Sequence, residues 1–423
     1  MTIVAGLDPN WTVGVDEIRS HFPALERTHA GYPVAYFDGP GGTQVPRSVV
    51  AAMDDYLFHH NANTHWLYPS SQETDDLIAR ARAALADFVF GRPDEIVFGQ
   101  NMTTLTFHLA RAIGRELGKG DEIVLTELDH HGNVAPWRAL EKERGVTVRM
   151  AQMRLEDGTL DWNHYQSLLN PRTKVVAIFA ASNALGTLNG LNQASKMARA
   201  AAPNVRIFVD AVHYAPHKAV DVKLFDCDFV GMSAYKFYGP HIGVLWGKRA
   251  AIEALDAPRL DPAPQESPER LETGTQNHEA IVGAGAAVDF IASLAVRSAS
   301  RRDGVVQALR GLEARNSVLF EKLWYSLTDI DGVRLYGPEP GRGRTPTLSF
   351  TLRGRSTDHV ATKLAQRGVF VSNGDFYAAT IADRYGVGGN GGGFVRAGCS
   401  CYTTEEEIDR LIEGVHQIAA GRA

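Results

Sequence analysis

Apolar and polar positions through the middle of the chain follow two alternating patterns. Short runs rich in β-branched and aromatic residues are separated by longer stretches in which apolar residues recur with helical spacing, which is typical of a mainly parallel sheet. The predicted strands are Glu95–Phe98, Glu122–Leu125, Thr147–Ala151, Val175–Ala180, Arg206–Val209, Phe229–Met232 and Gly243–Trp246. The predicted helices are Glu73–Phe88, Thr103–Glu116, Asn192–Ala201 and His278–Leu294.

The last third of the chain has a different order of elements. A long helix, near Asp303–Ser326, is followed by two strands, a helix, a further strand and a final helix. Thr404 and Glu407 form a capping box at the start of that final helix. The other predicted elements are strands near Arg334–Leu335, Thr347–Leu352 and Gly393–Ala397, and a helix at Asp358–Arg367. This order indicates a smaller α+β domain after the parallel sheet.

Composition and charge narrow the class of protein. A chain of 423 residues suits two domains better than one small core. The net charge of −6 gives no electrostatic support for a nucleic-acid partner. No apolar run approaches the roughly 20 residues that span a bilayer, and the first residues do not resemble a signal peptide. Only three cysteines occur, without metal-type spacing, so we expect neither a disulfide framework nor a metal site, and a cytoplasmic location.

Polar residues follow several of the predicted strands, at the edge where an open parallel sheet binds ligands. The first strand leads into Met102 and Thr103, a helix start that suits a phosphate group, although this segment taken alone favours an ordinary threonine N-cap. The second leads into His130 and His131, which could bind a metal, stack on a flat cofactor or lie exposed in a loop. The metal interpretation is the weakest of the three, because no further ligand has suitable spacing.

Three further strand ends carry reactive or hydrogen-bonding groups. Asn183 could bind a ligand or close a turn. Asp210 ends an apolar strand and needs a cationic partner, either a protonated pyridine nitrogen or a structural arginine. Lys236 would become a nucleophile for aldehydes if it were desolvated near other cations, but lysines in such positions are more often solvated or paired. Each signal is weak alone, and their succession along the sheet predicts one site.

Three motifs carry a resemblance to a known family. They are SNALGT (residues 182–187), DAVH (residues 210–213) and SAYKFYGP (residues 233–240). With these motifs the chain resembles the class V aminotransferase family of fold-type I pyridoxal-phosphate enzymes, in its cysteine desulfurase-like branch. The resemblance runs from Tyr36 to the C-terminal helix, over nearly the whole chain.

The resemblance implies a role for each matching residue. Lys236 would form the Schiff base with pyridoxal 5′-phosphate and move protons at the substrate α-carbon, Asp210 would pair with the pyridine nitrogen, and His130 would stack on the ring. Arg396 would clamp the substrate carboxylate. The other implied cofactor-binding residues are Met102, Thr103 and Ser233 at the phosphate, Tyr235 before the lysine, Asn183 and His213 near the phenolate oxygen, and Thr275, which would reach the phosphate of a neighbouring subunit.

The resemblance also implies the architecture. We expect a three-layer α/β large domain over residues 36–295, a small α+β domain over residues 296–423, and an N-terminal arm over residues 1–35 that packs with the small domain. The protein is expected to be a homodimer that acts on a small amino-acid substrate, with no nucleic-acid or membrane partner.

Three departures from the family pattern bear on the reaction. His213 stands where the family usually has Gln, and Tyr235 where it usually has His, which weakens the expected phosphate contact at that position. Residues 371–377, ending in Tyr377, lack the arginine and the catalytic cysteine of desulfurases.

Alternation along an expected strand over residues 394–402 points Cys399 and Cys401 into packing, away from Arg396. Cys227 lies far from the active end of the sheet, and the glycine run at residues 386–393 is expected to be a flexible loop, with a lid as one interpretation.

These observations favour one reaction and leave others open. Without a thiol at residue 377, we favour β-elimination from a cysteine-like amino acid, a C–S lyase reaction. A true cysteine desulfurase, an aminotransferase or amino-acid epimerase, and an inactive binding protein with this fold are the alternatives. The substrate side chain is left open, because Asp375, Tyr377, His65 and Trp66 could form pockets of several shapes.

Overall fold

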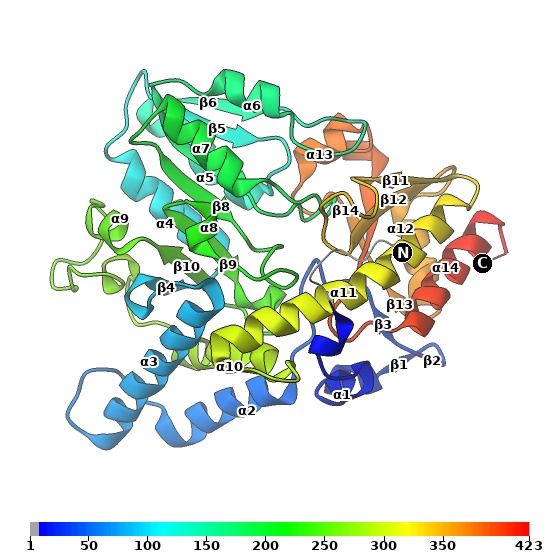
Figure 1. Cartoon of the computed structure of the whole chain (residues 1–423), viewed down its shortest axis with the longest axis horizontal. Coiled ribbons are helices and arrows are strands. Elements are labelled where there is room, and N and C mark those ends of the chain that lie inside the picture. Colours follow the sequence, from blue (N-terminus) through cyan, green and yellow to red (C-terminus); the bar gives the residue numbers. More distant parts are fainter. Residues whose placement is uncertain (1–7, 423) are drawn as a thin grey trace.

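The computed structural model describes residues 8–422 and contains two sheets of different kinds. Figure 1 shows the larger sheet on one side of the molecule, the smaller sheet on the other, and a long helix running between them. The larger sheet has seven strands in the order β4-β10-β9-β8-β7-β5-β6. Its strands are β4 (Ile96–Gly99), β5 (Glu122–Thr126), β6 (Thr147–Ala151), β7 (Thr173–Phe179), β8 (Arg206–Asp210), β9 (Phe229–Ser233) and β10 (Gly243–Gly247).

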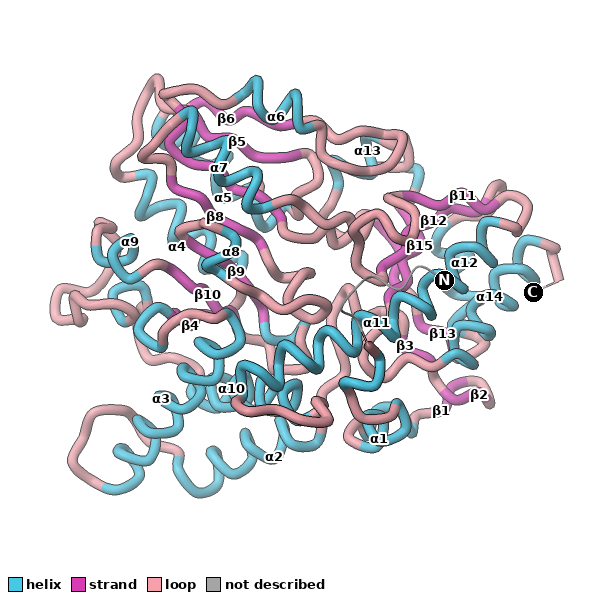
Figure 2. Tube along the Cα trace, viewed as in Figure 1, coloured by secondary structure: helices cyan, strands magenta, loops and turns pink. Residues whose placement is uncertain are grey.

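The predicted mainly parallel sheet is confirmed. Neighbouring strands from β6 through β5, β7 and β8 to β9 pair in parallel, and β10 lies antiparallel between β9 and β4. Every residue of β5, β9 and β10 is buried, which explains why these segments appear as nearly continuous apolar runs in the sequence. Figure 2 shows the strands stacked side by side, with helices on both faces.

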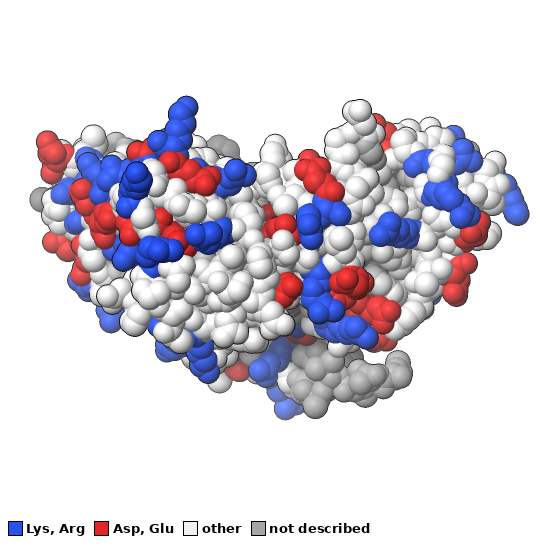
Figure 3. All heavy atoms as spheres, turned by 90° about the horizontal axis from the view of Figure 1, so that it is seen from above, with Lys and Arg blue, Asp and Glu red and all other residues white. Residues whose placement is uncertain are grey.

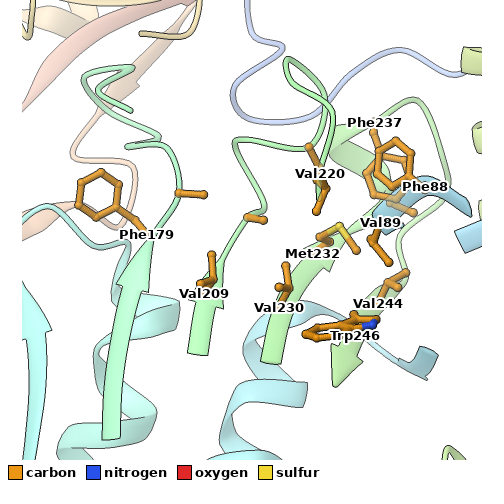
Figure 4. Packing of buried hydrophobic residues seen from close by; sticks show 14 of the residues in the cluster. Phe88, Val89, Phe179, Val209, Val220, Val230, Met232, Phe237, Val244 and Trp246 are labelled. Carbon is orange, nitrogen blue, oxygen red and sulfur yellow. The ribbon is translucent and has the colours of Figure 1, made fainter. Parts of the chain in front are cut away.

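Each face of this sheet packs against its own hydrophobic core. On one face Val97, Ile123 and Phe208 pack with α4 and α5, and on the other Val209, Val230 and Val244 lie next to one another with Val89 of α3 nearby (Figure 4). Alternate side chains of a strand therefore serve opposite layers. The helices of this part are α2 (Arg47–Asp55), α3 (Pro69–Val89), α4 (Met102–Gly114), α5 (Ala135–Arg144), α6 (Trp162–Leu168), α7 (Leu191–Ala201), α8 (Val222–Phe225), α9 (Arg249–Glu253) and α10 (His278–Ser293).

The smaller sheet confirms the predicted α+β region. It has four strands in the order β11-β12-β15-β14, and all of its neighbouring pairs are antiparallel. These strands are β11 (Val333–Tyr336), β12 (Thr347–Leu352), β14 (Ser372–Gly374) and β15 (Phe394–Gly398). The helices are α11 (Arg301–Thr328), α12 (Thr357–Ala365), α13 (Ala379–Arg384) and α14 (Glu405–Ala419), and α14 has the predicted capping box at Thr404 and Glu407.

The N-terminal segment contacts both regions. It contains α1 (Val15–Ser20), β1 (Thr28–His29), β2 (Tyr32–Pro33) and β3 (Ala35–Tyr36), and β3 pairs in parallel with β13 (Val369–Phe370) beside the smaller sheet. Phe22 packs against Tyr238, close to the end of β9, and against Tyr402. The domain boundaries after residues 35 and 295 stay a prediction.

Charged side chains of both signs share the surface of the molecule. Lys and Arg side chains are interspersed with Asp and Glu on the face shown in Figure 3. Within residues 8–422, no helix is both long enough and apolar enough to cross a membrane.

Candidate active site

A cavity of about 400 Å³ opens at the carboxyl ends of the larger sheet's strands. It is lined by Gln100, Asn101, Met102, Thr103, His130, Phe179, Ala181, Asn183, Asp210, Val212, His213, Ser233, Tyr235, Lys236 and His241. Nine of the eleven predicted site residues therefore lie together. The two that do not line the cavity are Arg396 and Thr275. Several lining residues were not predicted from the sequence. Val212 lies within the DAVH motif, and Gln100 and Asn101 directly precede Met102, so their positions could have suggested them.

One end of the cavity is formed by the start of α4. The Asn101 side chain accepts a hydrogen bond from the Thr104 amide (2.9 Å), so Asn101, and not a threonine, caps this helix. The Met102 amide donates to the Ser233 hydroxyl (3.1 Å), which ties the helix start to the end of β9. Of the first amides of α4, that of Thr103 has no partner among residues 8–422, and the positive end of the helix dipole favours an anion here. This end suits a phosphate group.

Lys236 lies in a single helical turn, residues 234–236, directly after β9. Its ammonium group donates to the carbonyl oxygen of Pro40, and the side chain is buried. Burial, aided by the positive charge of Arg396 and opposed by Asp210, lowers the pKa of Lys236 to about 7. A substantial fraction of the amine is therefore neutral near pH 7, as a nucleophile for an aldehyde requires.

Asp210 is buried at the end of β8, and its side chain accepts a hydrogen bond from the Val212 amide (2.9 Å). Burial raises the pKa of this carboxyl to about 6. No arginine within residues 8–422 forms an ion pair with Asp210. A structural arginine, one of the two partners considered from the sequence, is therefore not its partner. A protonated pyridine nitrogen would supply the missing positive charge, and Asp210 fits the implied cofactor.

Of the two adjacent histidines, only His130 lines the cavity. Its Nδ1 accepts a hydrogen bond from the Gly132 amide (2.9 Å), which leaves the proton of the neutral ring on Nε2. Burial and the nearby charges of Lys236 and Arg396 lower the pKa of His130 to about 4. A neutral, desolvated ring suits stacking on a flat cofactor. His131 instead contacts the Thr380 hydroxyl (3.2 Å).

Two other lining residues have polar atoms without a partner in the described chain. His213 places Nε2 at 2.9 Å from the Thr347 hydroxyl and 3.2 Å from that of Thr345, while its buried Nδ1 has no hydrogen-bond partner among residues 8–422. The Asn183 amide group donates to the Phe376 carbonyl (2.9 Å), and its Oδ1 is likewise unpartnered there. Because an unpaired buried polar atom is costly, these two residues fit a polar ligand group in the cavity.

Arg396 lies beside the cavity, on β15, and is covered by another side chain. Its guanidinium carbon lies 3.9 Å from the ring centroid of Phe376, one Nη donates to the Asn183 carbonyl (2.9 Å), and Nε has no partner within residues 8–422. Burial lowers the pKa of Arg396 to about 9, opposed by Asp38, so the group is still largely charged at pH 7. The Phe376 ring therefore covers one face of the guanidinium group.

The loop that contains Phe376 is held against the larger sheet. Phe376 and Tyr377 both have positive φ (58° and 57°), a strained backbone for such residues. The Phe376 carbonyl accepts from the Asn183 side chain and the Tyr377 carbonyl accepts from the His131 amide (2.7 Å). The Tyr377 side chain is 74% exposed, and its ring lies 5.6 Å from that of His130. An exposed aromatic side chain therefore lies beside His130, at the position where the resemblance to desulfurases implies the catalytic cysteine.

The cysteines lie outside the cavity. Cys227, Cys399 and Cys401 are all buried, as expected, and burial raises the pKa of Cys399 and Cys401 to about 12 and that of Cys227 still further. One detail of the expectation was wrong, because β15 ends at Gly398 and residues 399–402 do not continue the strand. Tyr402 accordingly packs on Phe22 and does not share a face with Arg396.

The remaining candidate residues lie at the surface of this chain. Thr275 is exposed in the loop before α10, away from the cavity of its own subunit. His65 and Trp66, between α2 and α3, are also exposed and do not line this cavity. The glycine run meets the start of α12, where Thr357 donates to the Gly392 carbonyl (2.8 Å).

These features define a pyridoxal-phosphate site of the fold-type I kind, and comparison with known proteins agrees. Residues 35–411 match the class V aminotransferase family, and the chain belongs to that family. Pyridoxal 5′-phosphate is the cofactor of this cysteine desulfurase-like enzyme.

Similar proteins cover nearly the whole chain. A cysteine desulfurase from Dickeya dadantii is 32% identical over 425 residues, covering 96% of each chain, and one from Haloferax volcanii is 31% identical, covering 96% of this chain and 97% of its own. Among solved structures, a cysteine desulfurase from Thermococcus onnurineus superimposes with a TM-score of 0.86 at 25% identity, covering 96% of this chain and 98% of its own. One from Escherichia coli gives 0.83 at 25% identity, covering 97% and 99%.

Proposed function

We propose that this enzyme is a C–S lyase that eliminates the sulfur group of a cysteine-like amino acid. One observation carries the proposal: Tyr377 stands where a desulfurase needs its thiol, while all three cysteines are buried outside the cavity with raised pKa values. Persulfide formation needs an accessible thiolate. Elimination needs only the cofactor, a proton-transferring lysine and a group that holds the substrate.

The cofactor, when bound, withdraws electrons from the substrate α-carbon. Lys236 binds it covalently and then moves the α-proton, for which an amine with a pKa near 7 is well matched. Asp210 keeps the pyridine nitrogen protonated, and His130 covers one face of the ring. Arg396 binds the α-carboxylate after the Phe376 ring has moved aside.

The other lining residues orient the cofactor. Thr103, Ser233 and the Met102 amide hold the phosphate, and Tyr235 forms the adjoining wall. Asn183 and His213 lie toward the phenolate oxygen. Thr347 has no other hydrogen bond to its hydroxyl within residues 8–422, so it can donate to His213 Nε2 and leave an Nδ1–H free to donate to the ligand.

The reaction balances without an external oxidant or reductant. The α-proton is removed, the Cβ–S bond breaks with its electron pair on sulfur, and the thiolate leaves protonated as a thiol or sulfide. The remaining unsaturated amine is hydrolysed by one water to pyruvate and ammonia. A desulfurase would instead give alanine and transfer its sulfur to a cysteine.

The desulfurase alternative keeps one supporting observation, since relatives that are 31–32% identical carry that name. Transamination and epimerisation use the same lysine and stay as further alternatives. An inactive binding protein is disfavoured by the nine predicted site residues that line one cavity.

Product analysis distinguishes these reactions. The holoenzyme is incubated with a panel of sulfur amino acids, and sulfide, pyruvate, alanine, keto acid and racemised substrate are each quantified. We expect pyruvate and sulfide in equal amounts, unchanged when Cys227, Cys399 and Cys401 are all replaced by Ala. Alanine in place of pyruvate would establish a desulfurase and overturn the proposal.

We also propose that the active enzyme is a cytoplasmic homodimer. Thr275 is exposed and would reach the phosphate bound by the partner subunit, and a group of exposed apolar side chains at the α2–α3 connection offers a surface for a second copy. This group consists of Leu57, Phe58, Trp66, Leu67 and Tyr68. Three unpaired thiols are typical of a reducing compartment. A cofactor-loaded, active species of monomer mass in sedimentation would contradict the dimer.

A further inference from the structure

One residue of the cavity wall has no role in the scheme above. His241 lies between Pro240 and the first residue of β10, lines the cavity and is exposed to solvent. Its ring stacks on that of Tyr235, with centroids 4.9 Å apart and an interplanar angle of 15°. Among residues 8–422 the imidazole has no hydrogen-bond partner, so its nitrogens are available to a ligand.

The backbone places His241 near the start of α4. Gly243, two residues later, pairs with Ser233 on one side and with Gly99 on the other. A Cβ added to Gly243 would lie 2.4 Å from the carbonyl carbon of Asn101, so only a glycine allows this approach. The segment that carries His241 therefore runs directly against the cap of α4 and beside Ser233, at the end of the cavity that suits a phosphate.

The side chains at this end of the cavity carry too little positive charge to balance a phosphate group. A phosphate monoester carries nearly two negative charges at pH 7. The other side chains near the helix start are neutral, namely Gln100, Asn101, Thr103 and Ser233. Lys236 is committed to the carbonyl carbon of the cofactor, and burial disfavours the charged forms of His130 and His213. The solvent-exposed imidazole of His241 is a further lining group that can donate a hydrogen bond to a phosphate oxygen.

We propose that His241 binds the phosphate group of pyridoxal 5′-phosphate and that Tyr235 holds its ring in place by stacking. Stacking on Tyr235 fixes the plane of the imidazole, and a hydrogen bond to an ionised phosphate is stronger than one between neutral groups. The inference rests on the cofactor and is independent of the reaction that follows. It also assigns a role to Tyr235, which supports a phosphate-binding residue six positions later in the chain.

The test compares two ligands that differ only in the phosphate. Apoprotein is titrated with pyridoxal 5′-phosphate and with pyridoxal, and the dissociation constants are measured by absorbance for the wild type, His241→Ala and His241→Gln. We expect His241→Ala to bind pyridoxal 5′-phosphate about tenfold more weakly, which equals ~1.4 kcal/mol, and to bind pyridoxal as the wild type does. His241→Gln should lose less, because an amide can still donate one hydrogen bond.

Two controls separate phosphate binding from a general effect on the wall. His359→Ala, an exposed histidine on α12 away from the cavity, should bind both ligands normally. Tyr235→Ala should reproduce part of the phosphate-specific loss, and Tyr235→Phe, which keeps the stacking ring, should lose less than Tyr235→Ala. The phosphorus NMR resonance of the bound cofactor should shift in His241→Ala. An equal loss for both ligands, or no loss for either, would overturn the proposal.

Discussion

The two halves of the active site are built in opposite ways. The half on the larger sheet places Asp210 at the end of β8 and Lys236 in the turn after β9, and packing on both faces of these largely buried strands holds each side chain in position. The half from the smaller sheet presents Arg396 beneath a loop with two strained residues, one of which, Tyr377, is largely exposed. We infer that the rigid half determines which cofactor binds, and that the loop determines which substrate enters and which reaction follows. Replacements in the two halves should therefore have distinguishable effects.

The largest effect is expected for Lys236→Ala. This replacement should abolish the absorbance band of lysine-bound cofactor and lower turnover by at least about 10²–10⁴-fold, the contribution typical of a positioned proton-transfer group. Circular dichroism should show a folded protein, because the change removes a buried, partly charged group. A cofactor adduct that borohydride can still reduce onto the variant would mean that another lysine carries the cofactor.

The second-largest effect is expected for Arg396→Ala, which should leave cofactor binding unchanged. Loss of the partner of a buried carboxylate costs about 2–5 kcal/mol, or roughly 30- to 5000-fold in kcat/KM for amino-acid substrates. The absorbance band should persist, in contrast to Lys236→Ala. Cysteamine, which lacks the carboxylate, provides the matched control. If its turnover fell as much as that of the amino acid, Arg396 would act on the fold or on the cofactor and not on the carboxylate.

Phe376→Ala should have a smaller effect in the opposite direction. The centroid of the Phe376 ring lies 3.9 Å from the guanidinium carbon of Arg396, and we propose that the ring hinders the approach of a carboxylate. A cation–π contact is worth about 0.5–2 kcal/mol, so removal of the ring should lower KM by about 2- to 30-fold. Tyr377→Phe, which keeps the loop and both aromatic rings, serves as the control. An unchanged or raised KM in Phe376→Ala would show that the ring helps to form the bound state.

The smallest effect on catalysis is expected for the cysteines. Replacement of Cys227, Cys399 and Cys401 by Ala should leave turnover within about twofold, while thermal stability falls because each change leaves a small cavity, at about 1 kcal/mol per site. Activity assays at 25 °C and thermal unfolding of the same samples measure the two effects separately. Loss of activity in a folded, cofactor-loaded single variant would identify a relocated desulfurase thiol.

Much of this site could be predicted from the sequence because its elements are local. The strands end within one or two residues of their predicted limits, since a buried parallel strand requires a short continuous run of apolar residues. Asp210 and Lys236 then follow directly from the position at which such a run stops. The order of these residues along the chain, together with the motifs around them, was enough to indicate the family.

Contacts between distant segments were decided by the tertiary structure alone. The placement of Phe376 over Arg396 depends on a loop whose carbonyl oxygens accept hydrogen bonds from Asn183 and His131. Both donors come almost 200 residues or more earlier in the sequence. The place of His241 beside α4 depends on Gly243 fitting against Asn101, a close approach that no periodicity records. Hydrophobic patterning encodes which face of an element is buried, but the meeting of two loop side chains depends on how whole layers pack. The sequence by itself therefore determined the fold and the cofactor chemistry, and only the packing of the two halves decided how the carboxylate-binding arginine is covered and which groups complete the phosphate end of the cavity.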